Sequence, residues 1–455
     1  MATTTAAERA NDASAVSLAG LPPGPRAPAV VQTLLWAVAP TWLMDRCART
    51  LGDSFTLTFA PSGLKLVLVS DPEAVKTVFT APAELAPSAA GASPVAPVMG
   101  PSSVIVLTGP EHMRQRKLLL PPFHGERMRE YESVIVEETR RDMASWPLGE
   151  PMRLQERTRA ITLEVILRAV FGVEAERMGP LRAAIGELLE PMHTVALLRV
   201  ALRRSGVGTL TGGIARALGR LDEVIYTEIG TRREQSDLGE RADILSLLML
   251  ARDEDGRPMT DSELRDELVT LLLAGHETTA TATAWAIERL IRHPDKLERL
   301  VGELDAGEDA YVTAVVNETL RVRPVVPIVV RMLSGPMHVG GYELPAGTRV
   351  VPAIYLTNRN PGVYERPAEF MPERFLGEGP ETFSWIPFGG GIRRCIGASF
   401  ALLEMKLILS TVLGELRPSL PRRAGRRRGE LIRRRAITLV PSAGAKVVWE
   451  RRPGR

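Results

Sequence analysis

Hydrophobic residues recur at helical spacing through the middle of this 455-residue chain, from about residue 111 to residue 302, with polar breaks near 149, 206–213 and 253–258. Short apolar runs at 55–59 and 66–69 flank a Pro-Ser-Gly turn and predict a β-hairpin. Similar short runs between 325 and 351 are separated by glycine and proline and predict further strands. The pattern therefore predicts a mainly α protein with a small β-sheet region.

The clearest single element is a long helix that begins after Thr260. Thr260-Asp-Ser-Glu263 is a capping box, in which the threonine and glutamate side chains satisfy backbone N–H groups of the first turn. Pro294 ends the helix after about His293. Residues 268–276 carry no formal charge on any face, so we expect the middle of this helix to be buried.

The remaining organisation indicates one domain. No internal repeat is present, and helical and strand segments are interleaved. We expect residues 1–25 to form a flexible leader and Pro-rich turn, and residues 26–455 to form a single domain. The leader lacks the basic start and apolar core of a secretory signal. The segment 27–44 is interrupted by Pro28, Gln32 and Pro40 and barely reaches spanning length, so we expect a soluble, cytoplasmic protein with no transmembrane anchor.

Composition narrows the function classes. The chain is 45% hydrophobic and 24% charged with a formal net charge of +3, which excludes disordered and collagen-like proteins. Two cysteines are too few for a disulfide framework. Residues 422–435 hold eight arginines and one acid, which predicts either a solvated hairpin or a surface that steers an acidic partner. No aromatic platform accompanies them, so we expect no nucleic-acid binding.

Candidate chemistry centres on the segment Phe388-Gly-Gly-Gly-Ile-Arg-Arg-Cys395-Ile-Gly397, which runs into an apolar-periodic helix. At a helix entry, unpaired N–H groups and the helix dipole favour a metal-binding thiolate over a thiol. The glycines at 389–391 would let the backbone approach a flat ligand closely. The alternative is a buried, inert cysteine beside an ordinary glycine turn.

A second polar set interrupts the long helix at Ala274-Gly-His-Glu-Thr278-Thr279. Glycine weakens a helix by about 1 kcal/mol relative to alanine, and a threonine hydroxyl can bond the carbonyl four residues earlier and distort the helix. We therefore expect a local opening here. The alternative is that Glu277 and Thr278 begin a solvated face.

Both segments resemble signatures of the cytochrome P450 superfamily. Phe388, Gly391, Arg393, Cys395 and Gly397 fall on the positions that define its haem-binding loop, and residues 274–278 are similar to its small-Gly-x-acid-Thr motif. The resemblance implies a cytochrome P450 fold of the soluble bacterial type. Haem b (iron protoporphyrin IX) would lie buried between the long helix and the cysteine-loop helix, with Cys395 as the ligand of the iron.

The resemblance also implies roles for individual residues. Glu277 and Thr278 would be catalytic, because oxygen activation needs protons from a hydroxyl backed by a titratable group. Glu318-x-x-Arg321 would form a structural triad with Arg374. The cofactor would be held by cations for its two propionates and by loop residues: His112, Arg116, Arg331, Arg393, Phe388, Gly389 and Gly397. A neutral imidazole bonds an anion less strongly than a guanidinium does, so His112 is the weakest of these cations.

The implied function is that of a monomeric haem-thiolate monooxygenase, inserting one oxygen atom from O2 into a lipophilic small molecule by hydroxylation or epoxidation. No flavin or iron–sulfur motif is present, so electrons would come from a ferredoxin and its reductase, docked near Arg114, Lys117 and Arg394. The family layout gives a mostly aliphatic pocket, closed by segments 82–101 and 189–200. Its lining would include Ala274, Val326, Val329 and Ile437.

Two alternatives remain open at this point. One is a peroxide-driven or rearranging haem-thiolate enzyme, whose known relatives lack the acid–threonine pair. The other is a non-catalytic haem binder.

Overall fold

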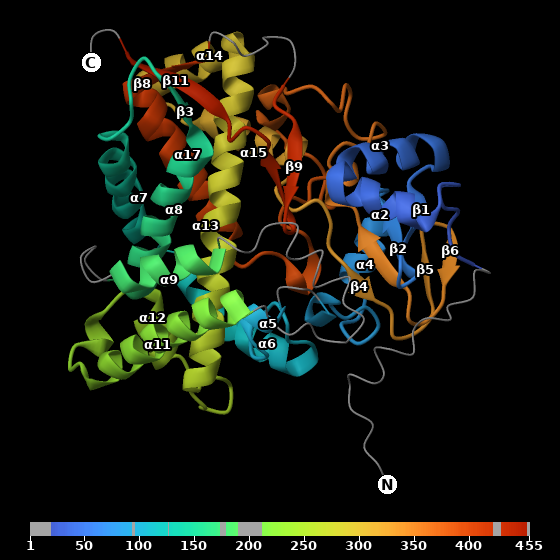
Figure 1. The fold of residues 1–455 in the computed structure, drawn as a ribbon, viewed down its shortest axis with the longest axis horizontal. Helices are drawn as coiled ribbons and strands as arrows, with labels where there is room; N and C mark the ends of the chain where they lie inside the picture. The colour runs from blue at the N-terminus through green and yellow to red at the C-terminus, as the bar shows by residue number, and fades with distance from the viewer. Residues whose placement is uncertain are drawn as a thin grey trace.

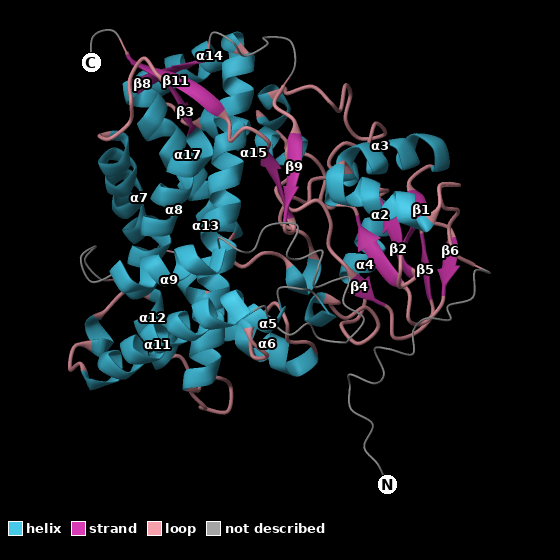
Figure 2. Ribbon diagram, in the orientation of Figure 1, coloured by secondary structure: helices cyan, strands magenta, loops and turns pink. Residues whose placement is uncertain are grey.

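The computed structural model describes residues 20–92, 96–125, 127–172, 179–189, 212–421 and 429–452. Among them, helices gather in one lobe and most strands in the other, with the long helix α13 (Asp261–Arg292) running through the centre (Figure 1, Figure 2). The expectation of a mainly α fold with small sheets is confirmed.

The other described helices are α2 (Ala29–Val38), α3 (Pro40–Leu51), α4 (Pro72–Thr80), α5 (Ala96–Met99), α6 (Gly109–Leu119), α7 (Arg127–Met143), α8 (Leu154–Phe171), α9 (Gly179–Leu189), α11 (Gly212–Glu234), α12 (Ile244–Leu250), α14 (Pro294–Asp305), α15 (Ala310–Val322), α16 (Ile354–Thr357) and α17 (Ala398–Glu415). The described strands are β1 (Ser54–Phe59), β2 (Leu64–Val69), β3 (Pro151–Arg153), β4 (Arg331–Met332), β5 (Met337–Val339), β6 (Tyr342–Leu344), β7 (Arg349–Pro352), β8 (Leu416–Ser419), β9 (Ile432–Arg435), β10 (Thr438–Pro441) and β11 (Lys446–Arg451).

The largest sheet has the strand order β1-β2-β7-β4, with β2 and β7 parallel and the other pairs antiparallel. The hairpin expected at 55–69 is present as β1 and β2, with Phe55 opposite Leu68. Alternate side chains of β2 enter two different hydrophobic clusters: Val67 and Val69 join one, and Leu66 and Leu68 join the other. Apolar residues on both faces of this strand therefore anchor the sheet between two layers.

The principal core lies in the helical lobe, where α8 and α17 pack against α13. The capping box of α13 is present: Glu263 N–H donates to Thr260 Oγ1, and Thr260 N–H donates to Glu263 Oε2 at 2.7 Å. The helix ends at Arg292, one residue before His293 and Pro294. Its central residues are held rigidly by packing on several sides, so it forms a fixed wall for a site.

The sequence predicts a flexible leader and a Pro-rich turn at the N-terminal end of the chain. Residues 1–19 lie outside the described residues. The Pro-rich turn after them packs against β1, where Thr56 N–H donates to the Pro23 carbonyl at 3.0 Å and Thr56 Oγ1 donates to the Pro22 carbonyl at 2.7 Å. Ordered contacts therefore begin ahead of residue 26. No described helix is long and apolar enough to cross a membrane.

Candidate functional site

The cysteine loop folds back on itself immediately before α17. Cys395 N–H donates to the Phe388 carbonyl at 3.0 Å, and Arg394 N–H donates to the Gly391 carbonyl at 3.0 Å. The Cys395 side chain is exposed, although protein encloses it closely enough for burial to raise the pKa of its thiol above the usual 9.0. The Gly397 N–H and the charge of Arg116 lower that pKa and favour the thiolate. The sulfur therefore faces a space that the surrounding protein encloses.

The glycines of the loop serve two different purposes. A Cβ added to Gly391 would lie 2.1 Å from the Phe79 carbonyl oxygen, and one added to Gly390 would lie 2.4 Å from the Phe79 ring. These two glycines therefore admit the C-terminal end of α4, and their expected approach to a flat ligand stays a prediction. A Cβ added to Gly389 or Gly397 would meet no atom within 4 Å, so these two border open space.

Three of the cations expected to hold the cofactor line one pocket. His112 of α6, Arg331 of β4 and Arg393 meet there beside Phe79 and Ser88. Burial lowers the pKa of Arg331 to about 10. Burial, with repulsion from Arg331 and Arg116, lowers the pKa of Arg393 to about 10.

No described carboxylate pairs with these cations. Salt bridges between Arg116, Arg331 or Arg393 and a described Asp or Glu are absent. Burial and the three arginines lower the pKa of His112 to about 4, so its imidazole is neutral at pH 7. Arg116 lies one helical turn from His112 and is also within electrostatic range of Cys395. With no described acid beside them, Arg331 and Arg393 can pair with an anion from outside the chain.

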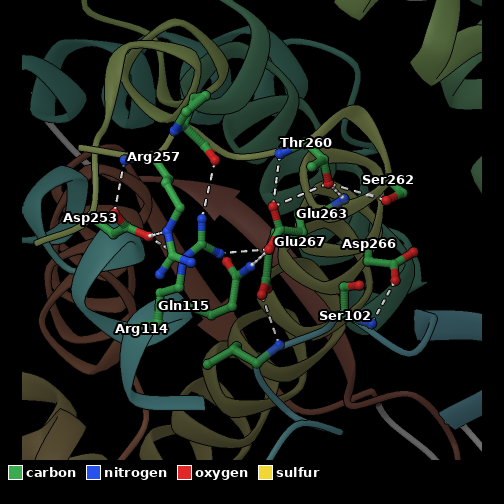
Figure 3. Close-up of polar contacts among 12 residues, drawn as sticks. Ser102, Arg114, Gln115, Asp253, Arg257, Thr260, Ser262, Glu263, Asp266 and Glu267 are labelled. Carbon is green, nitrogen blue, oxygen red and sulfur yellow. Dashed lines mark hydrogen bonds and ion pairs between the residues drawn. The ribbon is translucent and has the colours of Figure 1, made fainter. Parts of the chain in front are cut away.

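Arg393 also fixes the segment that precedes α6. Its guanidinium donates to the carbonyls of Val104 at 3.2 Å and Ile105 at 3.4 Å, and to that of Leu107. The same segment is held from the other side by α13, where the carboxylates of Asp266 and Glu267 accept from the N–H groups of Ser102 and Val104, both at 2.8 Å (Figure 3). This segment therefore connects the cysteine loop to α13.

The polar centre of α13 faces less crowded space than the rest of the helix. Ala274, Gly275, Glu277 and Thr278 are half-buried, while most of the helix around them is fully buried. Thr278 Oγ1 donates to the Ala274 carbonyl at 2.7 Å, which is the bond expected from the sequence. The helix is nevertheless continuous through this turn, so the expected local opening is not present.

Glu277 is held by two arginines that sequence reasoning did not identify. Arg159 of α8 donates from Nη2 to Glu277 Oε1 at 2.8 Å, and its Nε lies 2.8 Å from Oε2. Arg435 of β9 approaches Oε1 at 3.6 Å. The carboxylate therefore joins α13 to α8 and to the C-terminal hairpin, and no local pattern marks either arginine as its partner.

A second acid, which contacts α13, was also not predicted from the sequence. Glu404 of α17 is fully buried and hydrogen-bonds with Thr279, and burial raises its pKa to about 8. Its Oε1 has no hydrogen-bond partner. An acid inside an apolar helix at 398–415 was the available signal, but the spacing alone does not show which helix it faces.

The residues of the expected structural triad lie together. Arg321 donates to Glu318 through Nε at 2.6 Å and Nη2 at 2.8 Å, and both side chains are fully buried. Arg374 approaches Glu318 Oε1 at 3.7 Å. Arg321 also donates to three backbone carbonyls of the stretch that leads to the cysteine loop, those of Asn358, Pro367 and Glu369. The pair thereby fixes that stretch to α15.

The expected substrate-facing residues differ in exposure. Ala274, Val326 and Val329 are half-buried, and Ile437, in the turn between β9 and β10, is exposed. The segment 82–101 is hydrogen-bonded to β4, where Met332 N–H donates to the Pro87 carbonyl at 3.0 Å. Of the second expected lid, 190–200 lie outside the described residues, as do 422–428 of the arginine-rich segment.

The three residues expected to contact an electron donor differ in their pairing. Arg114 donates to Asp253 Oδ2 and to Glu263 Oε1, both at 2.6 Å, and these bonds tie α6 to the loop before α13 and to its first turn (Figure 3). Lys117 pairs with Glu254 at 2.6 Å. Arg394 is exposed and pairs with no described carboxylate. The docking role expected of these residues stays a prediction.

Comparison with known proteins decides the family. The cytochrome P450 family model matches residues 22–432. The chain belongs to the cytochrome P450 family. Cytochrome P450 137 of Mycobacterium tuberculosis is 43% identical to this P450 over 90% of this chain and 86% of that protein. Cytochrome P450 135B1 of Mycobacterium bovis is 39% identical over 95% of this chain and 92% of that protein.

Solved structures agree on the fold. Retinoic acid-bound cyanobacterial CYP120A1 matches with a TM-score of 0.83 and 24% identity, over 95% of this P450 and all of that chain. The haem domain of cytochrome P450DA matches with a TM-score of 0.82 and 23% identity, over 94% and 97%. The expected P450 fold is confirmed.

Haem b is the cofactor of this family, and the residues described above fit it. Cys395 presents a sulfur to an enclosed space, and Gly389 and Gly397 leave that space unfilled. His112, Arg331 and Arg393 offer donors to two carboxylates. The chain is a cytochrome P450 monooxygenase, and haem b is its cofactor.

Proposed function

We propose that this P450 inserts one oxygen atom from O2 into a lipophilic small molecule, by hydroxylation or epoxidation. The observation that carries the proposal is the half-buried pair Glu277–Thr278 on α13. Haem-thiolate chemistry supplies the activation of oxygen, because the cysteine sulfur pushes electron density toward the O–O bond. The protein must supply protons and exclude water from the substrate.

Thr278 and Glu277 have complementary parts in proton delivery. The Thr278 hydroxyl donates to the Ala274 carbonyl at rest, and rotation of its O–H bond would let the same Oγ1 pass a proton toward the cavity. Glu277 holds its proton-exchanging carboxylate at the junction of α13, α8 and β9, where Arg159 and Arg435 orient it. A hydroxyl relay backed by a carboxyl group is the arrangement that general acid catalysis requires.

The aliphatic character of Ala274, Val326, Val329 and Ile437 supports a lipophilic substrate. We place Arg116, Arg331, Arg393 and His112 on the haem propionates, with Phe388, Gly389 and Gly397 against the cofactor. Cys395 would be the iron ligand. Electrons would come from a ferredoxin and its reductase, docked near Arg394, in the cytoplasm of a bacterium, with the P450 acting as a monomer.

The test is Thr278→Ala in the haem-loaded protein. We expect reducing equivalents to be consumed while product falls and hydrogen peroxide rises, because proton delivery loses its last donor. Thr283→Ala is the matched control, since its hydroxyl makes the same type of bond one turn further along α13, to the Thr279 carbonyl at 2.9 Å. Equal coupling in the two variants would contradict the relay.

The same assay separates the alternatives. If added peroxide supports turnover better than reduced ferredoxin does, the enzyme is peroxide-driven. If haem is bound but no substrate that shifts the haem spin state is turned over, the protein is a non-catalytic binder.

A further inference from the structure

Exposed hydrophobic side chains are concentrated on one N-terminal surface. Of the twelve large hydrophobic side chains that are exposed among the described residues, five lie between positions 30 and 42. They are Val30, Val31, Leu34, Val38 and Trp42, with Val38 72% exposed. Scattered exposed apolar residues need no explanation, but a contiguous group of this kind marks an interaction surface.

The group forms a ridge along α2. Val30, Leu34 and Val38 recur every four residues and so share one face of the helix. The opposite side is anchored: Leu35 and Trp36 pack against the hydrophobic cluster of the β1–β2 sheet, and Gln32 Oε1 accepts from Thr58 N–H at 2.8 Å. Trp42, at the start of α3, extends the ridge. The packing therefore leaves the apolar face of α2 exposed. The helix lies in the sheet lobe, beside β1 (Figure 1).

The C-terminal hairpin packs against the anchored side of α2. Ile432 of β9 packs in the same cluster as Leu35 and Trp36, and Arg434 lies over the Trp36 ring, 5.6 Å from its centroid. Strand side chains alternate, so Arg435 points away from α2, where it approaches Glu277. The hairpin therefore fixes the helix and leaves its outer face uncovered.

Among residues 20–51, which carry the ridge, the charged side chains are mostly arginines. Arg26, Arg46 and Arg49 are exposed, and none forms a salt bridge with a described carboxylate. The only acid between residues 20 and 51 is Asp45, which accepts a hydrogen bond from the Tyr355 hydroxyl at 3.0 Å. Apolar side chains rimmed by arginines are complementary to a surface that is apolar inside and anionic outside.

We propose that this docking surface, comprising the outer face of α2 and Trp42, binds the surface of an anionic lipid bilayer. The helix lies on the membrane: no described helix could span one. A convex ridge fits a deformable lipid interface, in which the aliphatic side chains enter the acyl boundary and the arginines meet the phosphate groups. The inference does not depend on the identity of the substrate.

The experiment is flotation of the haem-loaded, full-length protein with vesicles of phosphatidylcholine alone or mixed with about 30% phosphatidylglycerol, which is anionic. We expect binding to the mixed vesicles at least about 10-fold stronger than to phosphatidylcholine alone, weakening as salt rises. Trp42 fluorescence should shift to the blue on binding, and Trp42→Phe should remove that shift.

Two pairs of substitutions make the test specific. Leu34→Glu with Val38→Glu should lower vesicle binding about 10-fold or more, because two charges would enter the apolar boundary. Leu250→Glu with Val363→Glu, at exposed hydrophobic positions elsewhere, should leave it unchanged. An unchanged Soret band in all variants verifies the fold. Equal binding by both pairs, or no binding to mixed vesicles, would overturn the proposal, as would a protein dimer that the first pair abolishes without any vesicle binding.

Discussion

The Glu277 carboxylate of α13 and the Arg159 guanidinium of α8 face each other through two atom pairs, each 2.8 Å apart. Both side chains are mostly buried, so the pair is screened less than a surface ion pair. It places the acid of the proposed relay under the control of a neighbouring helix. Movement of α8 would therefore change the position of the proposed catalytic carboxylate.

Removing either partner should affect catalysis unequally. We expect Glu277→Gln to lower product formation roughly 100-fold, within the range for loss of a general acid. Arg159→Met should lower it less, because Arg435 stays 3.6 Å from the carboxylate. Product formed per electron pair consumed is the measurement, and Arg159→Lys should recover part of the loss. A Glu277→Gln enzyme as active as the parent would refute the role of the acid.

Glu404 should make stability depend on pH. Burial raises its folded-state pKa to about 8, above the usual 4.5, so the unfolded chain releases this proton first as pH rises. The contribution of Glu404 is full below pH 4.5 and is lost as pH rises through 8. At about 1.4 kcal/mol per pKa unit, the loss between pH 5 and pH 8 is about 3 kcal/mol.

Glu404→Gln should therefore gain stability relative to the parent across that interval. Unfolding midpoints in urea at pH 5, 6, 7 and 8 would measure the difference. Parallel curves for the two proteins would show that Glu404 does not titrate in this range.

Two glycines of the cysteine loop should respond differently to alanine. Gly391 has a φ of 64°, and its added Cβ would collide with the Phe79 carbonyl, so Gly391→Ala should lower the stability of the protein by about 2 kcal/mol or more even without haem. Gly397→Ala meets no protein atom and should leave the apoprotein unchanged while reducing haem retention. Thermal unfolding of the apoproteins and haem titration separate the two effects. Equal behaviour of the variants would contradict this division.

The buried pair of Glu318 and Arg321 should be essential to the fold around the cysteine loop. Glu318→Gln leaves the Arg321 charge uncompensated at a fully buried position, which typically costs about 3–5 kcal/mol. Lys76→Gln, which removes an exposed pair with Glu73, should cost under about 1 kcal/mol. Denaturant unfolding and the fraction of protein retaining haem are the readouts. A small effect of Glu318→Gln would mean that the carbonyls around Arg321 suffice to hold it.

The local sequence was sufficient to predict the geometry wherever the interacting residues lie close together in the chain. The capping box at Thr260, the loop before α17 and the Glu318–Arg321 spacing each specify geometry within a few residues. The partners of Glu277 could not be predicted, because Arg159 and Arg435 are brought to it by helix packing and by a distant hairpin. The same holds for the sheet in which β11 joins β3 to β8, and for Phe79, which explains two glycines more than 300 residues away.

The pocket lined by His112, Arg331 and Arg393 affects how much of the protein stays folded in a cell. Without the cofactor Arg331 and Arg393 repel each other, and each anionic contact with haem relieves that repulsion only in the folded chain. Binding to the native state alone shifts the folding equilibrium by mass action. Cellular iron and porphyrin supply should therefore set how much of this polypeptide escapes proteolysis, and starved cells should hold less of it at unchanged messenger levels.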